Sequence, residues 1–527
     1  MKKIVSLSMI IALAVTGFAQ VDKTDWEGGY PEGCTSITAG RLATVDGSVV
    51  TSHTDDSHRT RSWMDIVPAK NHPRGAMTPM YKRQVDDTKA MPAYKHTVVG
   101  EIPQARKTFG FVNTAYPCMN EYQLGIGEST FGGHPELQSD AGIIDCQRLI
   151  QLMLERTKTA REAIELAGEL LGKYGWNDAG ECMTIADPHE VWHLEVVGPG
   201  KGKVGAVWAA QRVPDDHISV NANASTIKEI DPKDKDYFMV SDNIYDVARD
   251  NGWWNENETF RFCYAYAPES RTSIAARRRE WRVFDLLAPS LKLDAYAENY
   301  PFSVKPDEKV SLEDLVEVFQ DYYEGTDYNF VKDITVTDEN GKTVISPMAN
   351  PFMPYDMNLA FRINGGWGWR GERTIARWYT MYATIIQCRS WLPDDIGGIV
   401  WLAQDNVASS IYIPVFAGTT DLPVSYKTPG RVDGYTRESA WWAFNRLGTL
   451  AAQRWGDMRK DLEQVWEPMQ KEVFRETGEL EMRLAGVKNK KDRAELLTAL
   501  TMKWGETVVS KAWKLGDFLW TKYDEKF

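Results

Sequence analysis

The sequence predicts an α+β fold in which layers of strands are flanked by helices and followed by a helical C-terminal addition. Three observations support this prediction. Segments rich in β-branched residues and bounded by turn residues dominate as far as about residue 225. Two stretches between them carry apolar residues at helical spacing. From about Glu438 to the end the pattern is helical, with a break near 486–491.

The expected elements alternate along the first 290 residues. The expected strands are Thr35–Thr38, Ser48–Ser52, Thr108–Asn113, Gly125–Glu128, Cys182–Ala186, Val191–Val197 and His217–Val220. The expected helices are Asp140–Arg156, Thr159–Tyr174 and the arginine-rich stretch Thr272–Leu287. Residues 305–435 mix short elements of both kinds around glycine, proline and aromatic clusters.

Composition narrows the function classes. The chain has 527 residues with 43% hydrophobic content, which is enough for a large buried core. Its formal charge of -13 argues against a nucleic-acid partner, because it has no basic excess to neutralise phosphates. Beyond the N-terminus no stretch has the apolar length of a membrane span, so we expect no stable membrane insertion.

The N-terminus has the pattern of a signal peptide. Lys2 and Lys3 precede the apolar run Ile4–Val15, and small residues precede a cleavage point after Ala19. We therefore expect residues 1–19 to be a bacterial export signal and the protein to be periplasmic or extracellular. Residues 20–33 are polar and rich in glycine, which is typical of a short leader.

The chain contains six cysteines, at positions 34, 118, 146, 182, 263 and 388. An even number in an exported protein permits disulfides, but this density is too low for a disulfide-built scaffold. Neither a Cys-x-x-Cys pair nor zinc-finger spacing occurs. The question is therefore whether one cysteine is chemically special.

Cys34 is the candidate for such a cysteine. It opens a strand pattern that is followed by a turn at Asp46-Gly47 and a second strand, which predicts a hairpin. The polar cluster His53–His58 follows this hairpin. An ordinary core cysteine is the alternative. If the chain is cut before Cys34, a free α-amine with a pKa of roughly 7.7–8.0 lies beside the thiol and can act as its base.

The segment CTSITAGRLATVDGSVVTSHTDD, residues 34–56, resembles the start of the cysteine dipeptidase family, dipeptidase A type, of the N-terminal-nucleophile hydrolases. More distantly it is similar to penicillin V acylases and bile salt hydrolases. The resemblance implies a four-layer αββα sandwich and the use of Cys34 as nucleophile. It also implies self-cleavage at Gly33–Cys34 and hydrolysis of dipeptides through a thioester. We expect no cofactor and no metal.

The resemblance also implies roles for residues around this thiol. In the wider superfamily an arginine and an aspartate near this point contact the cysteine. By position the aspartate is Asp56, and the arginine position falls on His53, which we expect to bind substrate. Asn120, in the sequence NEYQL, matches an asparagine that helps to form the oxyanion hole; taken alone it reads as a turn asparagine. Glu128 follows at strand spacing and is expected to line the cleft.

Two further segments complete the implied site. Asn223 in the stretch WAAQRVPDDHISVNANASTI would be the second oxyanion-side donor, with Asn221 as the near neighbour. An arginine in SRTSIAARRREWRVFDLL would approach the nucleophile and lower the pKa of its thiol. The match places it at Arg279, with Arg278 and Arg282 as rivals.

A competing motif is His189-Glu190-x-x-His193, which matches the zinc-protease pattern literally. That motif binds zinc only on a helix, where residues four apart share one face. Here a β-rich sequence surrounds it, and two histidines four apart on a strand lie about 13 Å apart. The segment therefore predicts a hairpin with a turn at 187–190.

We expect residues 34–435 to form the catalytic domain and residues 436–527 a helical extension packed on it. The substrates would be small peptides. The sequence leaves open whether the chain forms a homo-oligomer. The alternative function is an acylase acting on N-acyl amino acids or conjugated bile acids. A third hypothesis is a non-catalytic peptide-binding protein, in which replacing Cys34 changes no activity.

Overall fold

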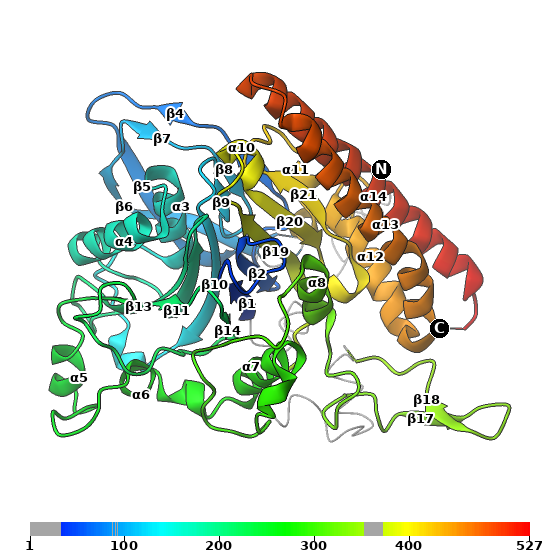
Figure 1. The fold of residues 1–527 in the computed structure, drawn as a ribbon, viewed down its shortest axis with the longest axis horizontal. Helices are drawn as coiled ribbons and strands as arrows, with labels where there is room; N and C mark the ends of the chain where they lie inside the picture. The colour runs from blue at the N-terminus through cyan, green and yellow to red at the C-terminus, as the bar shows by residue number, and fades with distance from the viewer. Residues whose placement is uncertain (1–32, 87, 90, 92, 352–372, 527) are drawn as a thin grey trace, which may run out of the picture. The chain divides into compact units, whose positions relative to one another are not determined.

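The computed structural model describes residues 33–86, 88–89, 91, 93–351 and 373–526. Its centre consists of two antiparallel sheets, which confirms the predicted α+β class (Figure 1). The first sheet has the order β16 (Ser303–Val304), β14 (Ile218–Asn221), β1 (Gly33–Ala39), β2 (Val49–Asp56), β19 (Thr380–Cys388), β20 (Ile399–Gln404), β21 (Ile413–Phe416). The second has the order β15 (Phe238–Val240), β13 (Val207–Val213), β12 (Val191–Val197), β11 (Gly180–Ala186), β10 (Gly125–Gly132), β9 (Met119–Asn120), β8 (Phe111–Asn113), β3 (Asp65–Val67).

The two sheets contact each other through β1 and β2 on one side and β10 and β11 on the other. Ser36 Oγ donates to the backbone oxygen of Glu128 at 2.9 Å, and the hydroxyls of Thr51 and Thr184 lie 2.7 Å apart. Every residue of β1 and β2 is buried, because these strands are covered on both faces. The polar side chains in this middle layer must therefore find partners within the protein.

Helices cover the outer sides of the two sheets (Figure 1). The helices are α3 (Cys146–Arg156), α4 (Ala160–Tyr174), α5 (Asp246–Asp250), α6 (Phe262–Tyr266), α7 (Ile274–Leu287), α8 (Leu312–Gln320), α10 (Asp394–Gly397), α11 (Val424–Lys427), α12 (Ala440–Gln453), α13 (Trp455–Leu484) and α14 (Lys490–Lys522). Helices α3 and α4 lie against the eight-stranded sheet, and α12 and α14 lie against β20 and β21. The smaller strand pairs are β4 (Lys70–Asn71) with β7 (Lys107–Thr108), β5 (Met77–Asp86) with β6 (Ala93–Pro103), and β17 (Thr335–Thr337) with β18 (Thr343–Ile345).

The predicted hairpin after Cys34 is confirmed. Asp46 Oδ1 accepts the backbone N–H of Ser48 at 3.0 Å, and Gly47 takes a φ of 85°, which a side chain would disfavour. Strands β1 and β2 pair so that Cys34 lies opposite Asp55. The turn therefore sets the register that brings the thiol beside the polar cluster of β2.

The predicted hairpin at the zinc-protease-like motif is also confirmed. Asp187 Oδ1 accepts the backbone N–H groups of His189 at 2.8 Å and Glu190 at 3.1 Å, which closes the turn. His193 lies within β12, and its Nε2 is 3.0 Å from the hydroxyl of Thr38. The two histidines thus occupy a turn and a strand, and they share no helical face.

Some elements differ from the predictions at their boundaries. Helix α3 begins at Cys146, because Asp145 accepts the N–H of Arg148 as its N-cap. The long hairpin β5–β6 was not among the predicted strands, since its exposed residues mix polar and apolar types without clear alternation. The C-terminal helices have a further break at Arg454, and the predicted signal peptide and leader residues 1–32 lie outside the described residues.

The C-terminal helices share one packed core with the sheets. Thr501 on α14 donates its hydroxyl to the backbone oxygen of Pro414 in β21 at 2.9 Å. Arg493 at the start of α14 pairs with Asp395 at 2.7 Å. The division between a catalytic domain and a helical extension at 435/436 stays a prediction, while the hydrophobic core continues across it.

All six cysteines are buried and free, so the permitted disulfides are not formed. Within the described part of the chain, no helix has both the length and the apolar character needed to cross a membrane.

Replacing Leu497 with alanine tests whether α14 is part of the cooperative core. Leu497 is fully buried, and its truncation should destabilise the protein by about 2–5 kcal/mol. The exposed Met482 on α13, replaced by alanine, should change stability by less than about 0.5 kcal/mol. The measurement is denaturant unfolding followed by tryptophan fluorescence and circular dichroism. Separate melting of the helices with an unchanged sheet transition would contradict a shared core.

Candidate active site

Cys34 is the second residue of β1 and lies in the layer between the two sheets. Only 5% of its surface is exposed. Its Sγ donates to Glu128 Oε1 on β10 at 3.0 Å, and its backbone N–H donates to Asn223 Oδ1 at 3.0 Å. The contact between the sheets therefore places a thiol against a carboxylate that lies 94 residues away in the sequence.

Glu128 also binds His53, which comes from the neighbouring strand β2. His53 Nε2 lies 3.1 Å from the same carboxylate oxygen, and the imidazole contacts the rings of Tyr116 and Tyr382 edge-on. Burial alone would lower the pKa of His53, but the hydrogen bond and charge of Glu128 outweigh it, and the net pKa is raised. Burial would raise the pKa of Glu128, yet His53 lowers it below its usual value. The two groups therefore form a buried imidazolium–carboxylate pair.

The surroundings of Cys34 disfavour its thiolate while the chain is uncut. Burial raises the pKa of the Cys34 thiol well above its usual value. The negative charges of Glu128, Asp55 and Asp56 raise this pKa further. A thiol in this state is a weak nucleophile, so a reaction at Cys34 needs a base within reach.

Arg279 on α7 is the arginine that reaches Cys34. Its Nη1 donates to the backbone oxygen of Cys34 at 2.6 Å and to the hydroxyl of Thr35 at 2.9 Å. Its Nη2 donates to the backbone oxygen of Ala222 at 2.8 Å and to Asn223 Oδ1 at 2.9 Å. Burial, and then the charge of Arg373, lower the pKa of Arg279 to about 9. The guanidinium therefore ties the carbonyl of Cys34 to the segment that contains Ala222 and Asn223.

The two rival arginines of α7 have other partners. Arg278 donates to the backbone oxygen of Ala295 at 2.9 Å and stacks on the ring of Tyr328. Arg282 pairs with Asp321 at 2.8 Å. Among these three arginines, Arg279 is therefore the one with a hydrogen bond to Cys34.

Asn223 joins the cluster with its oxygen toward Cys34. Two N–H donors, from Cys34 and Arg279, converge on its Oδ1, which identifies that atom as the acceptor. Its Nδ2 donates to the backbone oxygen of Thr130 at 2.6 Å, and its φ is 59°. Its neighbour Asn221 donates instead to the backbone oxygen of Ala224. In the uncut chain Asn223 therefore orients the Cys34 nitrogen and does not present the amide donor that the resemblance implied.

Asp56 lies opposite Gly33 in the pairing of β1 and β2. Its carboxylate pairs with Arg373 and accepts the hydroxyl of Thr380 at 2.6 Å. A side chain at Gly33 would collide with the Arg373 guanidinium and lie 2.5 Å from the Asn223 oxygen. Asp56 thus acts on the cluster by positioning Arg373 beside the residue that precedes Cys34.

Asn120 does not join this cluster, which corrects its expected place in an oxyanion hole. Its Nδ2 donates to the backbone oxygens of Leu154 at 2.9 Å and Thr157 at 2.8 Å, and its Oδ1 accepts the N–H of Leu124 at 3.1 Å. It therefore closes the turn before β10 and ties it to the end of α3. Leu124, which Asn120 binds, lies four positions before Glu128, which is about 13 Å along an extended chain. The turn that Asn120 closes therefore lies away from the part of β10 that contacts Cys34.

The sequence reading missed Arg373, Thr380 and Tyr382. Tyr382 lies on β19 with its hydroxyl 3.5 Å from His53 Nδ1. These residues are more than 320 positions from Cys34 and carry no local motif. The pairing of β19 with β2 brings Thr380 and Tyr382 to the site, and Arg373 lies in the segment just before β19.

The Sγ of Cys34, the imidazole of His53 and the carboxylate of Glu128 have donor atoms within 4.8 Å of one another. These are donor types that zinc accepts. Here Cys34 and His53 instead each hydrogen-bond to Glu128, an arrangement suited to proton transfer. The expectation that no metal takes part stays a prediction.

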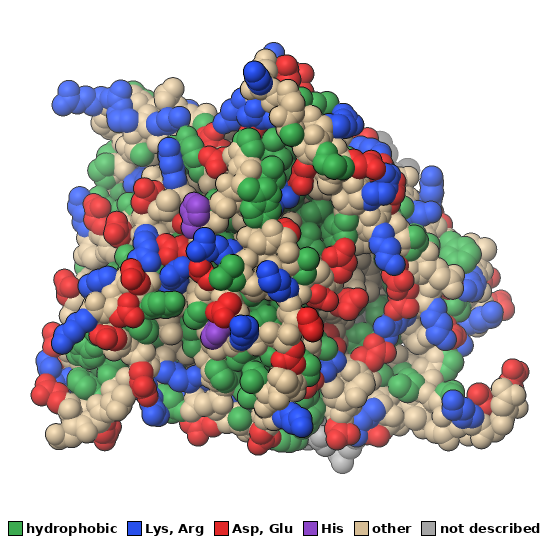
Figure 2. Space-filling model, in the orientation of Figure 1, with side chains coloured by type: hydrophobic (Ala, Val, Ile, Leu, Met, Phe, Trp, Pro, Cys, Tyr) green, Lys and Arg blue, Asp and Glu red, His purple; other side chains and the backbone are tan. Residues whose placement is uncertain are grey.

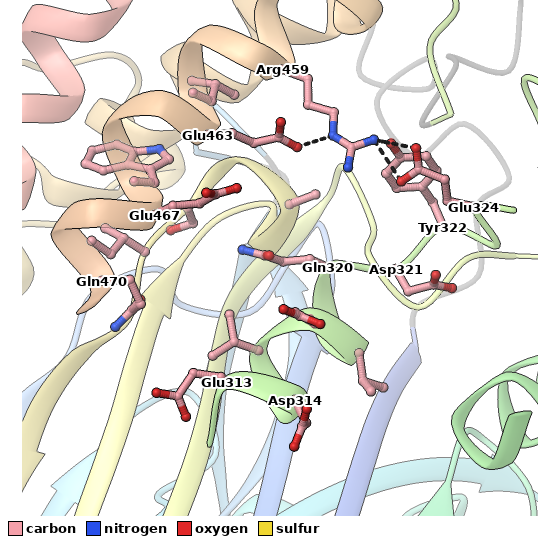
Figure 3. A pocket seen from close by; sticks show the side chains of 18 of the residues that line it. Glu313, Asp314, Gln320, Asp321, Tyr322, Glu324, Arg459, Glu463, Glu467 and Gln470 are labelled. Carbon is pink, nitrogen blue, oxygen red and sulfur yellow. Dashed lines mark hydrogen bonds and ion pairs between the residues drawn. The ribbon is translucent and has the colours of Figure 1, made fainter. Parts of the chain in front are cut away.

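A separate cavity of about 700 Å³ lies between α8 and α13. Figure 2 shows acidic side chains around a recess on this face, and Figure 3 shows Glu313 and Asp314 on one side with Glu463 and Glu467 on the other. Arg459 bridges Glu324, at 2.7 Å, and Glu463. None of the described residues of the Cys34 cluster lines this cavity, so it is distinct from the reactive centre.

A model of peptidase family C69 matches residues 33–468. The chain is similar to a probable dipeptidase B of Lactococcus lactis subsp. lactis, at 24% identity covering 75% of this chain and 76% of the relative. It is 25% identical to a probable dipeptidase of Latilactobacillus sakei, covering 81% and 82%. It is 21% identical to dipeptidase A of Lactobacillus helveticus, covering 92% and 95%.

Replacing His53 with glutamine should make the stability of the protein less dependent on pH above neutrality. Because the pKa of His53 is raised above 6.5 in the fold, its stabilisation is complete below 6.5 and is lost as pH rises through the folded pKa. The variant should lose about 3–5 kcal/mol at pH 6, and less at pH 9. The measurement is denaturant unfolding between pH 5 and 9.

His193→Gln is the matched control with the opposite sign. Burial lowers the pKa of His193 to about 3, so its contribution to stability falls as pH drops below 6.5. The difference between wild type and this variant should therefore change mainly below pH 6.5. Parallel pH profiles for His53→Gln and wild type would contradict the imidazolium–carboxylate pair.

Proposed function

Because the chain belongs to peptidase family C69, we propose that it is a cysteine dipeptidase that cuts itself before Cys34 and then uses this residue as nucleophile and base. The observation that carries the proposal is the placement of Cys34. Its sulfur, nitrogen and carbonyl oxygen are each held by a separate side chain: Glu128, Asn223 and Arg279. The names of the relatives support dipeptides as substrates over acyl amides. Family membership favours an enzyme over a non-catalytic binding protein.

The proposed mature enzyme uses the α-amine of Cys34 as its base. Asn223 Oδ1 accepts the Cys34 N–H in the uncut chain. In the mature enzyme it would accept one hydrogen of the free amine, which turns the lone pair of the amine toward the thiol. The amine takes the thiol proton, and Sγ attacks the peptide carbonyl. The amine then protonates the leaving amino group. Water hydrolyses the resulting thioester and regenerates the thiol.

The substrate carbonyl would take the place that Gly33 holds in the uncut chain. Gly33 lies against the Arg373 guanidinium and the Asn223 oxygen, in contact too close for a side chain. Removing the leader vacates this space beside the thiol. Arg373, held by Asp56, would then face the substrate carbonyl and stabilise the negative charge that develops on its oxygen.

The proposed enzyme has the fold and location expected from the resemblance. Two facing sheets with helices outside support the four-layer αββα sandwich of N-terminal-nucleophile hydrolases. Export to the periplasm or the exterior, with residues 1–19 as signal, would place the enzyme where peptides enter the cell. A homo-oligomer also stays a prediction.

Intact mass and N-terminal sequencing of the purified protein test the self-cleavage. Wild type should begin at Cys34, while Cys34→Ala should retain residues upstream and lose dipeptide hydrolysis by at least about a thousandfold. Cys118→Ala replaces a buried cysteine whose thiol donates to the backbone oxygen of Val112, and this variant should begin at Cys34 and stay active. A panel of dipeptides and N-acyl amino acids identifies the substrate class. An active enzyme that still carries residues upstream of Cys34 would refute the mechanism.

A further inference from the structure

The proposed self-cleavage before Cys34 needs a base, and the α-amine that serves the mature enzyme does not yet exist. Before the cut, the Cys34 nitrogen belongs to a peptide bond, and its N–H donates to Asn223 Oδ1 at 3.0 Å. An amide nitrogen has no basic lone pair, so it cannot take the thiol proton. The uncut chain therefore needs a different base for the attack on Gly33.

Glu128 is placed to be that base. Its Oε1 lies 3.0 Å from Cys34 Sγ, within the range required of a general base. Among the residues that the structure describes, Glu128 is the side chain hydrogen-bonded to the thiol. The neighbouring carboxylates are engaged elsewhere, since Asp55 accepts the hydroxyl of Thr60 at 2.7 Å and Asp56 binds Arg373.

The protonation states fit this assignment. The pKa of Glu128 is lowered by its hydrogen bond to His53, against the effect of burial, so its carboxylate is ionised and able to accept a proton. The raised pKa of His53 makes the imidazole a donor to Glu128 rather than a competing base. His53 is thus a positioning residue, since it acts through Glu128.

The peptide to be cut is also held in place. On the C-terminal side of the bond to be cut, Arg279 binds the carbonyl oxygen of Cys34 at 2.6 Å. On the N-terminal side, Gly33 fits between the Arg373 guanidinium and the Asn223 oxygen, where a side chain would collide. Glycine at this position therefore lets the backbone of residue 33 approach a cation that can stabilise an oxyanion.

We propose that Glu128 is the general base of the self-cleavage that frees Cys34, a role that ends when the α-amine appears. The inference rests on the proposed function. Glu128 Oε1 takes the Sγ proton while Sγ bonds to the carbonyl carbon of Gly33. The bond from that carbon to the Cys34 nitrogen then breaks, and Glu128 returns the proton to this nitrogen, which becomes the free amine. Water hydrolyses the thioester, which leaves a carboxylate on Gly33 and restores the thiol.

The experiment compares Glu128→Gln in two forms of the protein. The first is the chain from residue 20 onward, in which intact mass follows the cut with time. The second begins at Cys34, released from a removable N-terminal fusion, and is assayed for dipeptide hydrolysis. In the first form the cut should slow by at least about a hundredfold. In the second form kcat should fall far less than the rate of the cut, because the α-amine is then the base.

Glu181→Gln is the matched control. Glu181 is a buried acid on the adjacent strand β11 that hydrogen-bonds Thr130 at 2.8 Å. Burial, and then the charge of Glu128, raise its pKa well above the usual value, so glutamine closely mimics its neutral form. This variant should cut itself at close to the wild-type rate. Circular dichroism and thermal unfolding establish that each variant is folded.

Each outcome decides the assignment. A Glu128→Gln precursor that cuts itself at the wild-type rate overturns it. Loss of kcat in the form that begins at Cys34, as complete as the loss of the cut, would show that Glu128 only holds the site together, and also overturns it. If Glu128→Gln does not fold, Glu128→Asp is taken through the same two assays, and its cut should be slowed by a larger factor than its kcat. An inactive wild type that begins at Cys34 would refute the proposed dipeptidase. The mass data on the cut would still show whether Glu128 is the base of the self-cleavage.

Discussion

The hydrogen bond between Cys34 and Glu128 is the interaction on which the site depends. It crosses the layer between two sheets, and it exists because β1 packs face to face against β10. Neither partner has solvent to stabilise its charge, as Cys34 is 5% exposed and Glu128 is fully buried. A buried carboxylate in that position is tolerated only with a partner, and His53 supplies one from the adjacent strand β2.

The same reasoning extends to the other charges of the cluster. Asp56 is compensated by Arg373, and the Arg279 guanidinium is surrounded by backbone and side-chain oxygens. The net result is a buried network in which acids and cations alternate around one thiol. Because these charges are fixed by strands and by α7, they require little reorganisation when a proton moves, which is the condition for electrostatic catalysis.

Much of the fold and part of the site follow from local sequence. The hairpin from Cys34 is encoded by Asp46-Gly47 and the β-branched residues on either side of it, and the false zinc motif is excluded by the β-rich residues around His193. Arg279 and Asn223 were found only through a family resemblance. Asn120 misled, because a turn asparagine and an oxyanion asparagine share the same local signature. Arg373 could not be found at all, since its approach to Gly33 depends on long-range strand pairing.

The charge distribution around the thiol also fits the two successive reactions that we propose for this site. Before the proposed cut the acids raise the pKa of Cys34, so the thiol stays protonated, and Gly33 fills the space beside Arg373. Cutting the chain adds an ionisable amine within the same residue, and it removes Gly33 from its place beside Arg373. The new amine supplies a base beside the thiol, and the departure of Gly33 opens room for a substrate carbonyl. In the proposed sequence Glu128 takes the thiol proton before the cut, and the amine takes over that role once the cut has introduced it.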